Sequence, residues 1–164
     1  PKLATLLGLA PSTETLVVLI RGMVGHFLQM SDAPDEEEAQ QLRLMITSQL
    51  DDGEFARVLY EKIGDLIGPV FTASLERAVE TGDASEVGQR PINLFWFAHH
   101  MVLQLVLTRL PPTNCLSYGE TAQLERQACE FILRGLGLNE TAIAAHLDRD
   151  LAPDPAPERS TESA

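Results

Sequence analysis

Residues 92–110 read INLFWFAHHMVLQLVLTRL, and this stretch decides the fold class. Its apolar side chains recur every three or four residues, which is the spacing of an α-helix. Successive helical residues lie about 100° apart, so one face carries Ile92, Phe95, Trp96, His99, Leu103, Val106 and Leu110, and the opposite face carries Leu94, Ala98, Met101 and Leu105. A polar stripe lies between these faces and contains Asn93, His100, Gln104 and Thr108. A helix that is apolar on two opposite sides must be buried on both.

Helical spacing continues on the N-terminal side of this stretch. Ser12 or Thr13 predicts the N-cap of a helix that runs to about residue 30. Pro34 and the acidic residues 35–38 predict the start of the next helix, because carboxylates stabilise the positive end of the helix dipole. This acidic run is therefore interpreted as a helix start and a solvated face rather than as a metal site.

A long helix is predicted over residues 54–81. Gly82 follows it in the position that favours a left-handed cap. Pro69 lies inside the helix, where it removes one backbone hydrogen bond and clashes with the preceding turn. We therefore expect a kink near Asp65.

The remaining segments complete an all-helical pattern. Residues 117–120 have capping-box spacing and predict a helix that closes near Gly135 or Gly137. Residues 2–9 have the pattern of the last turns of a helix, and residues 139–151 that of a short final helix. No Val/Ile/Thr alternation is flanked by hairpin turns. The sequence therefore predicts an all-α bundle of about six helices.

The composition of the chain excludes several classes of function. The 164 residues fit one domain, and residues 152–164, rich in Pro, Ser and charge, indicate a flexible tail. The net charge of -12 argues against direct binding of nucleic acid or of an anionic membrane. No apolar run reaches the roughly 18 residues of a membrane span. Cys115 and Cys129 are too few for a disulfide framework, so we expect a cytoplasmic protein.

Motifs for catalysis and for metal binding are missing from the sequence. It contains no H-E-x-x-H, G-x-S-x-G or phosphate-binding glycine loop. His99 and His100 are adjacent, so on a helix they point about 100° apart and do not easily share a metal. Cys115 is interpreted as a loop thiol and Cys129 as a core residue. We expect no enzyme activity, no metal and no cofactor.

Two neighbouring helices carry more apolar surface than one small bundle covers easily. They are the helix over residues 92–110 and the helix predicted to begin at residues 117–120. The second of these helices has apolar side chains over about half of its circumference. Two such helices from each of two chains would form a symmetric four-helix interface. The residues assigned to this interface are Leu94, Ala98, Met101, Leu105, Leu124, Ala128, Phe131 and Ile132. The alternative is a monomeric bundle in which both helices are simply central.

Several stretches resemble the C-terminal, ligand-sensing domain of TetR-family transcriptional repressors. FARVLY at residues 55–60, followed by Gly68-Pro69, resembles the family's long helix with an internal proline. LERAVETGD at residues 75–83 resembles a recurring helix end, and FILRGLG at residues 131–137 the end of the last dimerisation helix. The order of helices matches over residues 1–137.

The resemblance implies a division of the chain and a function. Residues 1–10 would end a linking helix, and residues 11–151 would form the ligand-binding and dimerisation domain. The family's N-terminal helix-turn-helix domain of about fifty residues has no counterpart in this sequence. The implied function is a sensor whose ligand controls DNA binding by that domain, and the implied partners are a second copy and a small apolar or aromatic ligand.

Candidate ligand-binding residues are large, adaptable or aromatic side chains near the helix faces described above. They are Met23, His26, Phe27, Met45, Phe71, Phe95, Trp96 and His99. Each suits a hydrophobic core equally well, and a buried histidine such as His99 is more often a hydrogen-bonded core residue. Two other functions stay open, namely a free-standing helical interaction protein and a lipid carrier or enzyme of similar fold.

Overall fold

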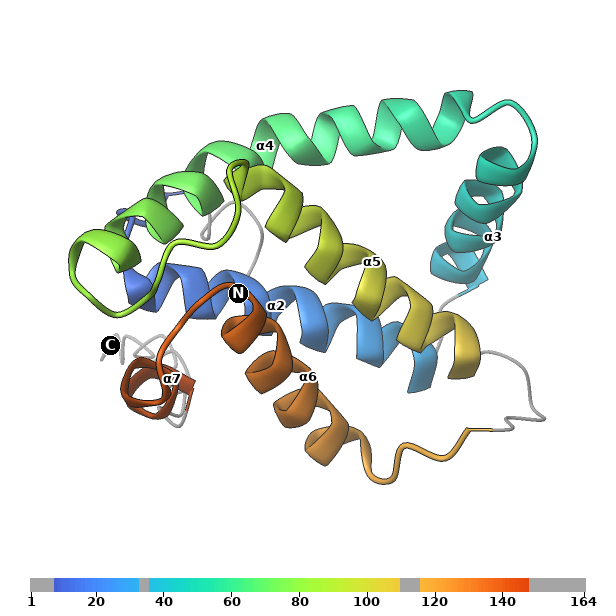
Figure 1. The fold of residues 1–164 in the computed structure, drawn as a ribbon. Helices are drawn as coiled ribbons and strands as arrows, with labels where there is room; N and C mark the ends of the chain where they lie inside the picture. Colours follow the sequence, from blue (N-terminus) through green and yellow to red (C-terminus); the bar gives the residue numbers. More distant parts are fainter. Residues whose placement is uncertain (1–7, 33–35, 110–115, 148–164) are drawn as a thin grey trace, which may run out of the picture.

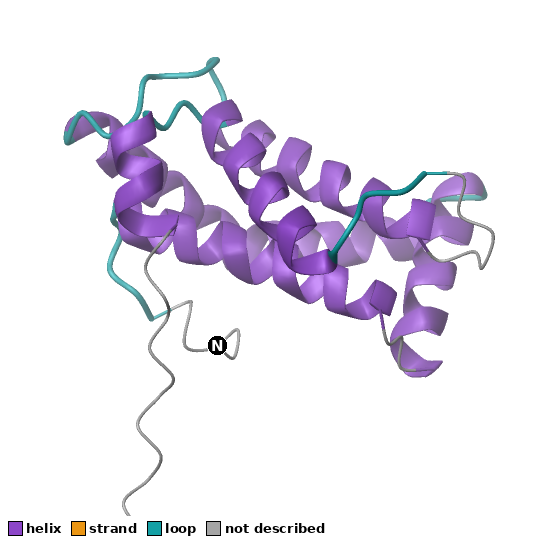
Figure 2. Cartoon of the chain, turned by 90° about the horizontal axis from the view of Figure 1, so that it is seen from below, coloured by secondary structure: helices purple, strands orange, loops and turns teal. Residues whose placement is uncertain are grey.

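The computed structural model describes residues 8–32, 36–109 and 116–147. These ranges form the helices α2 (Thr13–Asp32), α3 (Glu36–Leu50), α4 (Glu54–Glu80), α5 (Pro91–Arg109), α6 (Thr121–Gly135) and α7 (Glu140–Leu147) (Figure 1). They contain no β-strand, and Figure 2 shows only helices joined by loops. The predicted all-α bundle is confirmed. The expected linking-helix end, apart from residues 8–10, and the expected tail lie outside the described residues.

The helix α2 lies at the centre of the bundle. It packs against α4, α5, α6 and α7, while α3 packs mainly on α4 (Figure 1). Leu16, Val17, Ile20, Val24 and Leu28 of α2 are almost fully buried, and they form the middle of the main core. A smaller core joins α3 to the C-terminal part of α5. No helix within the described residues combines the length and the apolar character of a transmembrane segment.

Three predicted helix ends are confirmed by their local geometry. Ser12 caps α2, since its Oγ accepts a hydrogen bond of 3.0 Å from the Thr15 backbone N–H. Gly82 follows α4 with a φ of +78°, and Asn139 caps α7 through a bond of 2.9 Å from the Ala142 N–H. The final helix ends at Leu147 within the described residues, so the predicted extension to residue 151 lies outside them.

The predicted capping box at residues 117–120 is wrong. The helix α6 begins only at Thr121, and Glu120 precedes it without a side-chain capping bond. Gly119 has a φ of +76°, so the chain turns immediately before the helix and leaves Ser117 outside it. The turn at this glycine therefore prevents Ser117 from capping the helix as the sequence spacing had indicated.

Two glycines bring α4 and α5 close together. A Cβ placed on Gly64 would lie 3.3 Å from Trp96 Cζ2, and one on Gly68 would lie 3.2 Å from Ile92 Cδ1. Gly64 and Gly68 are four residues apart on α4, and Ile92 and Trp96 are four residues apart on α5. The two contacts therefore follow one another along the same line between the helices, which we call the α4–α5 seam. The helix α4 continues through Pro69, and Figure 1 shows its axis turning near the middle, as expected for an internal proline.

The α4–α5 loop is tied both to α2 and to the α6–α7 loop. The Thr13 hydroxyl on α2 donates a hydrogen bond of 2.6 Å to Asp83 Oδ2. An isolated antiparallel bridge joins Ala84 to Leu138, with bonds of 2.9 Å from Ser85 N–H to the Gly137 carbonyl and from Asn139 N–H to the Asp83 carbonyl. These contacts hold the end of the bundle at which α2 begins and α7 packs.

We expect Thr13→Val to lower the unfolding free energy by about 1–2 kcal/mol at neutral pH, because Asp83 loses a charge-assisted hydrogen bond. The hydrogen bond from Thr13 is the largest cause that lowers the pKa of Asp83. This contribution is present above the ordinary Asp pKa near about 4 and is lost as the pH falls through the lower native value. Urea unfolding at neutral and strongly acidic pH checks this, with the exposed Thr47→Val as control. A loss that persists undiminished in acid contradicts the assignment.

Candidate functional site

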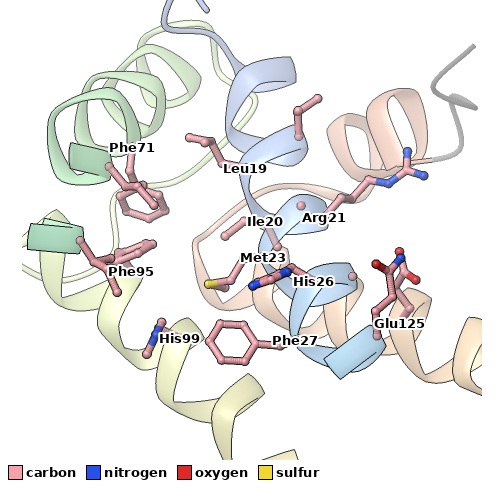
Figure 3. A pocket seen from close by; sticks show the side chains of 16 residues that line it. Leu19, Ile20, Arg21, Met23, His26, Phe27, Phe71, Phe95, His99 and Glu125 are labelled. Atoms are coloured by element: carbon pink, nitrogen blue, oxygen red, sulfur yellow. The ribbon is translucent and has the colours of Figure 1, made fainter. Parts of the chain in front are cut away.

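A cavity of about 690 Å³ lies between α2, α4 and α5, with α6 at one edge (Figure 3). Most of its lining residues come from α2. Its lining consists of Val18, Leu19, Ile20, Arg21, Gly22, Met23, Gly25, His26, Phe27, Gln29, Ile63, Ile67, Phe71, Phe95, His99 and Glu125.

The lining is apolar at one side and polar at the other. Figure 3 shows Phe71 and Phe95 on one side of the cavity and Arg21 and Glu125 on the opposite side. Phe71 and Phe95 are buried, and their ring centroids lie 5.4 Å apart. Gly25 leaves room for Glu125, since a Cβ there would lie 3.4 Å from Glu125 Oε1. A ligand in this cavity would therefore meet an apolar interior and a charged edge.

His99 is the buried polar residue of the cavity wall. Its side chain is 4% exposed and contacts the rings of Phe27, Phe95, Tyr60 and Trp96 at centroid distances of 5.3–6.3 Å. Its Nδ1 has no hydrogen-bond partner within the described part of the chain. Burial, with a smaller effect of His100, lowers the pKa of His99 to about 4. The imidazole is therefore neutral near pH 7, with one nitrogen able to donate and the other to accept.

Because His99 is neutral in the native state and protonates more readily when unfolded, the unfolding free energy should fall as the pH drops from about 6.5 towards 4. This group contributes a slope of at most about 1.4 kcal/mol per pH unit. We expect His99→Leu to remove that slope, measured by urea unfolding across this range. The exposed His26→Gln at the same cavity should keep it. Identical profiles for the wild type and His99→Leu contradict a neutral, buried His99.

The structure brings six of the eight candidate ligand residues together around the cavity. They are Met23, His26, Phe27, Phe71, Phe95 and His99. Two others lie elsewhere, and their assignment is corrected. Met45 is buried in the small core between α3 and α5, because its side of α3 faces Leu103 and Val106. Trp96 lines a separate surface groove, since its ring lies outward from Phe95 and His99.

Sequence reasoning missed the α4 contribution to the cavity apart from Phe71. Ile63 and Ile67 precede Phe71 by eight and four residues, so the three side chains form one stripe along α4. This spacing was available in the sequence. The charged edge at Arg21 and Glu125 carried no such signal, because it depends on how α2 and α6 cross.

The predicted interface residues divide into two groups. Ala98, Leu124, Ala128 and Ile132 are only 4–5% exposed, because the chain's own helices cover them. Their assignment to a subunit interface is corrected to the core of the single chain. Leu94, Met101 and Leu105 are half-buried, and Phe131 is 69% exposed.

Phe97 was missed as a surface residue. It is 65% exposed and lies in the stripe of α5 that the sequence indicated as polar, beside the exposed Asn93, His100 and Gln104. Its position three residues after Leu94 and four before Met101 places all three on adjoining positions of one face. The exposed apolar surface of α5 is therefore centred on Phe97 rather than on Ala98.

Other reactive side chains form no further centre in the described residues. Cys129 is buried in the main core, and burial raises the pKa of its thiol to about 12, so it stays protonated at neutral pH. Cys115 lies outside the described residues. No group of three or more His, Cys, Asp or Glu side chains within residues 8–32, 36–109 and 116–147 is placed to hold a metal ion.

Comparisons of this chain with protein-family models, with curated proteins and with solved structures find no match.

Proposed function

We propose that this chain is the ligand-sensing and dimerisation domain of a TetR-like transcriptional repressor, and that it binds a small apolar or aromatic effector. The observation that carries the proposal is the cavity of about 690 Å³ between α2, α4 and α5. Its volume falls in the range of roughly 300–1,000 Å³ that ligand sites occupy. The resemblance of the helix order and of residues 55–60, 75–83 and 131–137 to the family supports the regulatory role.

The lining indicates the chemistry of the effector. Phe71, Phe95 and the α4 isoleucines offer apolar contact area, and Met23 adapts to irregular shapes. The unpartnered Nδ1 of the neutral His99 favours a ligand that carries one polar group able to hydrogen bond. We therefore propose an uncharged, mainly apolar molecule with one such group.

The proposed mechanism is a shift in the arrangement of the helices that meet at the cavity. A ligand between α2, α4 and α5 would favour the arrangement that contacts it best. In the complete repressor, that arrangement would set a spacing of two helix-turn-helix domains that does not fit adjacent major grooves. DNA would be bound only by those domains, which these 164 residues do not include.

We expect saturable binding of the uncharged fluorescent probe N-phenyl-1-naphthylamine to the folded chain. Met23→Trp should weaken it, because the larger side chain occupies part of the cavity. Leu50→Trp adds the same group to a position on α3 that is 84% exposed, and should leave binding unchanged. Probe emission at fixed protein concentration measures both. Equal binding by the two variants contradicts the cavity as the ligand site.

A lipid carrier is a second candidate, because the same apolar cavity suits an acyl chain. Mass spectrometry of the purified chain would detect a co-purified lipid. The coding sequence upstream of residue 1 separates the two functions. A helix-turn-helix in the same reading frame supports the repressor, and a gene product without one contradicts it.

A further inference from the structure

A second concave feature lies on the surface where α4 and α5 meet. This aromatic groove has a volume of about 380 Å³ and is lined by Tyr60, Glu61, Gly64, Asp65, Trp96 and His100. None of these residues lines the cavity described above. The two features adjoin each other, since His99 of the cavity wall packs against Tyr60 and Trp96.

The three rings of the groove form a corner. Trp96 and His100 are stacked, with centroids 6.3 Å apart and an angle of 26° between their planes. Tyr60 stands nearly perpendicular to both, at 5.4 Å from Trp96 and 5.7 Å from His100. Gly64 has no side chain to cover the Trp96 ring, which lies close to it. The Gln49 amide donates a hydrogen bond to the Tyr60 hydroxyl and holds that ring in place.

The groove is lined by acidic side chains and carries negative charge. Glu61 and Asp65 lie four residues apart on α4, so both carboxylates border the same groove, and no Lys or Arg lines it. Glu61 is paired with Arg57 at 2.9 Å, whereas no ion-pair partner for Asp65 is found among the described residues. The net charge of -12 adds an attractive field for a cation and a repulsive one for an anion.

We propose that this groove binds a small organic cation, with a quaternary or methylated ammonium group against the Tyr60 and Trp96 rings and near the Asp65 carboxylate. Such a group is attracted to the negative faces of aromatic rings and is more easily stripped of water than a bare ammonium. A neutral molecule of the same shape gains neither the ring attraction nor the carboxylate. The site is separate from the effector cavity, so it stands without the proposed function.

Choline and its uncharged isostere 3,3-dimethylbutan-1-ol test this inference directly. Trp96 is the only tryptophan, so its emission reports on the groove. With ionic strength held constant by NaCl, choline should change Trp96 emission saturably and bind at least about fivefold more tightly than the isostere. Equal affinity for the two compounds, or a choline titration without saturation, overturns the proposal.

Substitutions locate the binding. Asp65→Asn should weaken choline binding by about threefold, because it removes the unpaired carboxylate. Tyr60→Leu should weaken it by a similar factor through the loss of one ring face. Glu76→Gln removes a carboxylate elsewhere on the exposed surface of α4 and should leave it unchanged. Circular dichroism establishes that each variant is folded. If Asp65→Asn and Glu76→Gln behave alike in folded protein, the cation does not bind at the groove.

Discussion

Gly137→Ala should lower the unfolding free energy by about 3–5 kcal/mol, which is a large part of the roughly 5–15 kcal/mol that stabilises a small domain. Gly137 has a φ of +92°, where a side chain is strained. A Cβ built there would lie 2.2 Å from the Ser85 carbonyl oxygen and 2.8 Å from Val87 Cγ2. The nearer atom belongs to the backbone, so it does not move away by a change of rotamer.

Relief of this clash must open the bridge between the α4–α5 and α6–α7 loops. The bonds from Ser85 N–H to the Gly137 carbonyl and from Asn139 N–H to the Asp83 carbonyl would be lost together. Gly88→Ala is the matched control, because Gly88 has a φ of +69° and no atom within 4 Å of its added Cβ. It should cost only about 1–2 kcal/mol. Urea unfolding of both variants at one protein concentration measures the difference, and equal losses contradict the steric argument.

The fold was predictable where the signal lies within a few consecutive residues. Ser12, Gly82 and Asn139 end or begin helices through their own side chain or backbone freedom, so their positions follow from the sequence. The capping box at residues 117–120 failed because Gly119 turns the chain before α6 begins. Spacing alone does not distinguish a cap from a preceding turn.

Contacts between distant segments were not predictable in the same way. The seam of Gly64 and Gly68 against α5 depends on which faces of the two helices meet. The bridge between Ala84 and Leu138 joins two loops that are far apart in the sequence. Neither produces a periodic pattern, because each depends on a single close approach of one backbone to another element.

The sequence indicated which types of residue line the cavity, but it did not indicate which of the candidate residues lie there. Aromatic and methionine side chains on α2 and α5 do border the cavity, because the apolar faces of these helices turn towards each other. Trp96 shares the helical face of Phe95, yet it is only half-buried and lines the surface groove, since Gly64 has no side chain to cover its ring. A helical wheel gives the direction of a side chain and does not show which neighbour covers it.

Phe131→Glu should convert the protein from a dimer into a folded monomer, if the proposed dimerisation through α5 and α6 holds. Phe131 on α6 and Phe97 on α5 are 69% and 65% exposed, and Leu94, Met101 and Leu105 of α5 are only half-buried. Soluble monomers seldom leave large contiguous apolar surfaces uncovered. A second copy of the chain would cover these side chains on both molecules at once.

The expected effect is large because a symmetric interface contains each substitution twice. Removing an aromatic hot-spot residue from an interface typically costs about 2 kcal/mol, which corresponds to roughly thirtyfold in the dissociation constant. Each buried glutamate adds a desolvation cost and adds to a net charge of -12 that already opposes association. Phe97→Glu should act in the same direction, since Phe97 lies beside Leu94 and Met101 on α5.

Light scattering at micromolar concentration decides the question, with circular dichroism to establish folding. The wild type should have twice the 18.0 kDa mass of one chain, and Phe131→Glu should have the mass of one chain. The glutamate would lie in water in the monomer, so loss of the dimer need not unfold the chain. Leu50→Glu, on an exposed position of α3, should remain dimeric. A wild-type mass near 18.0 kDa would show instead that Phe97 and Phe131 remain exposed in solution and that α5 and α6 do not form a homodimer.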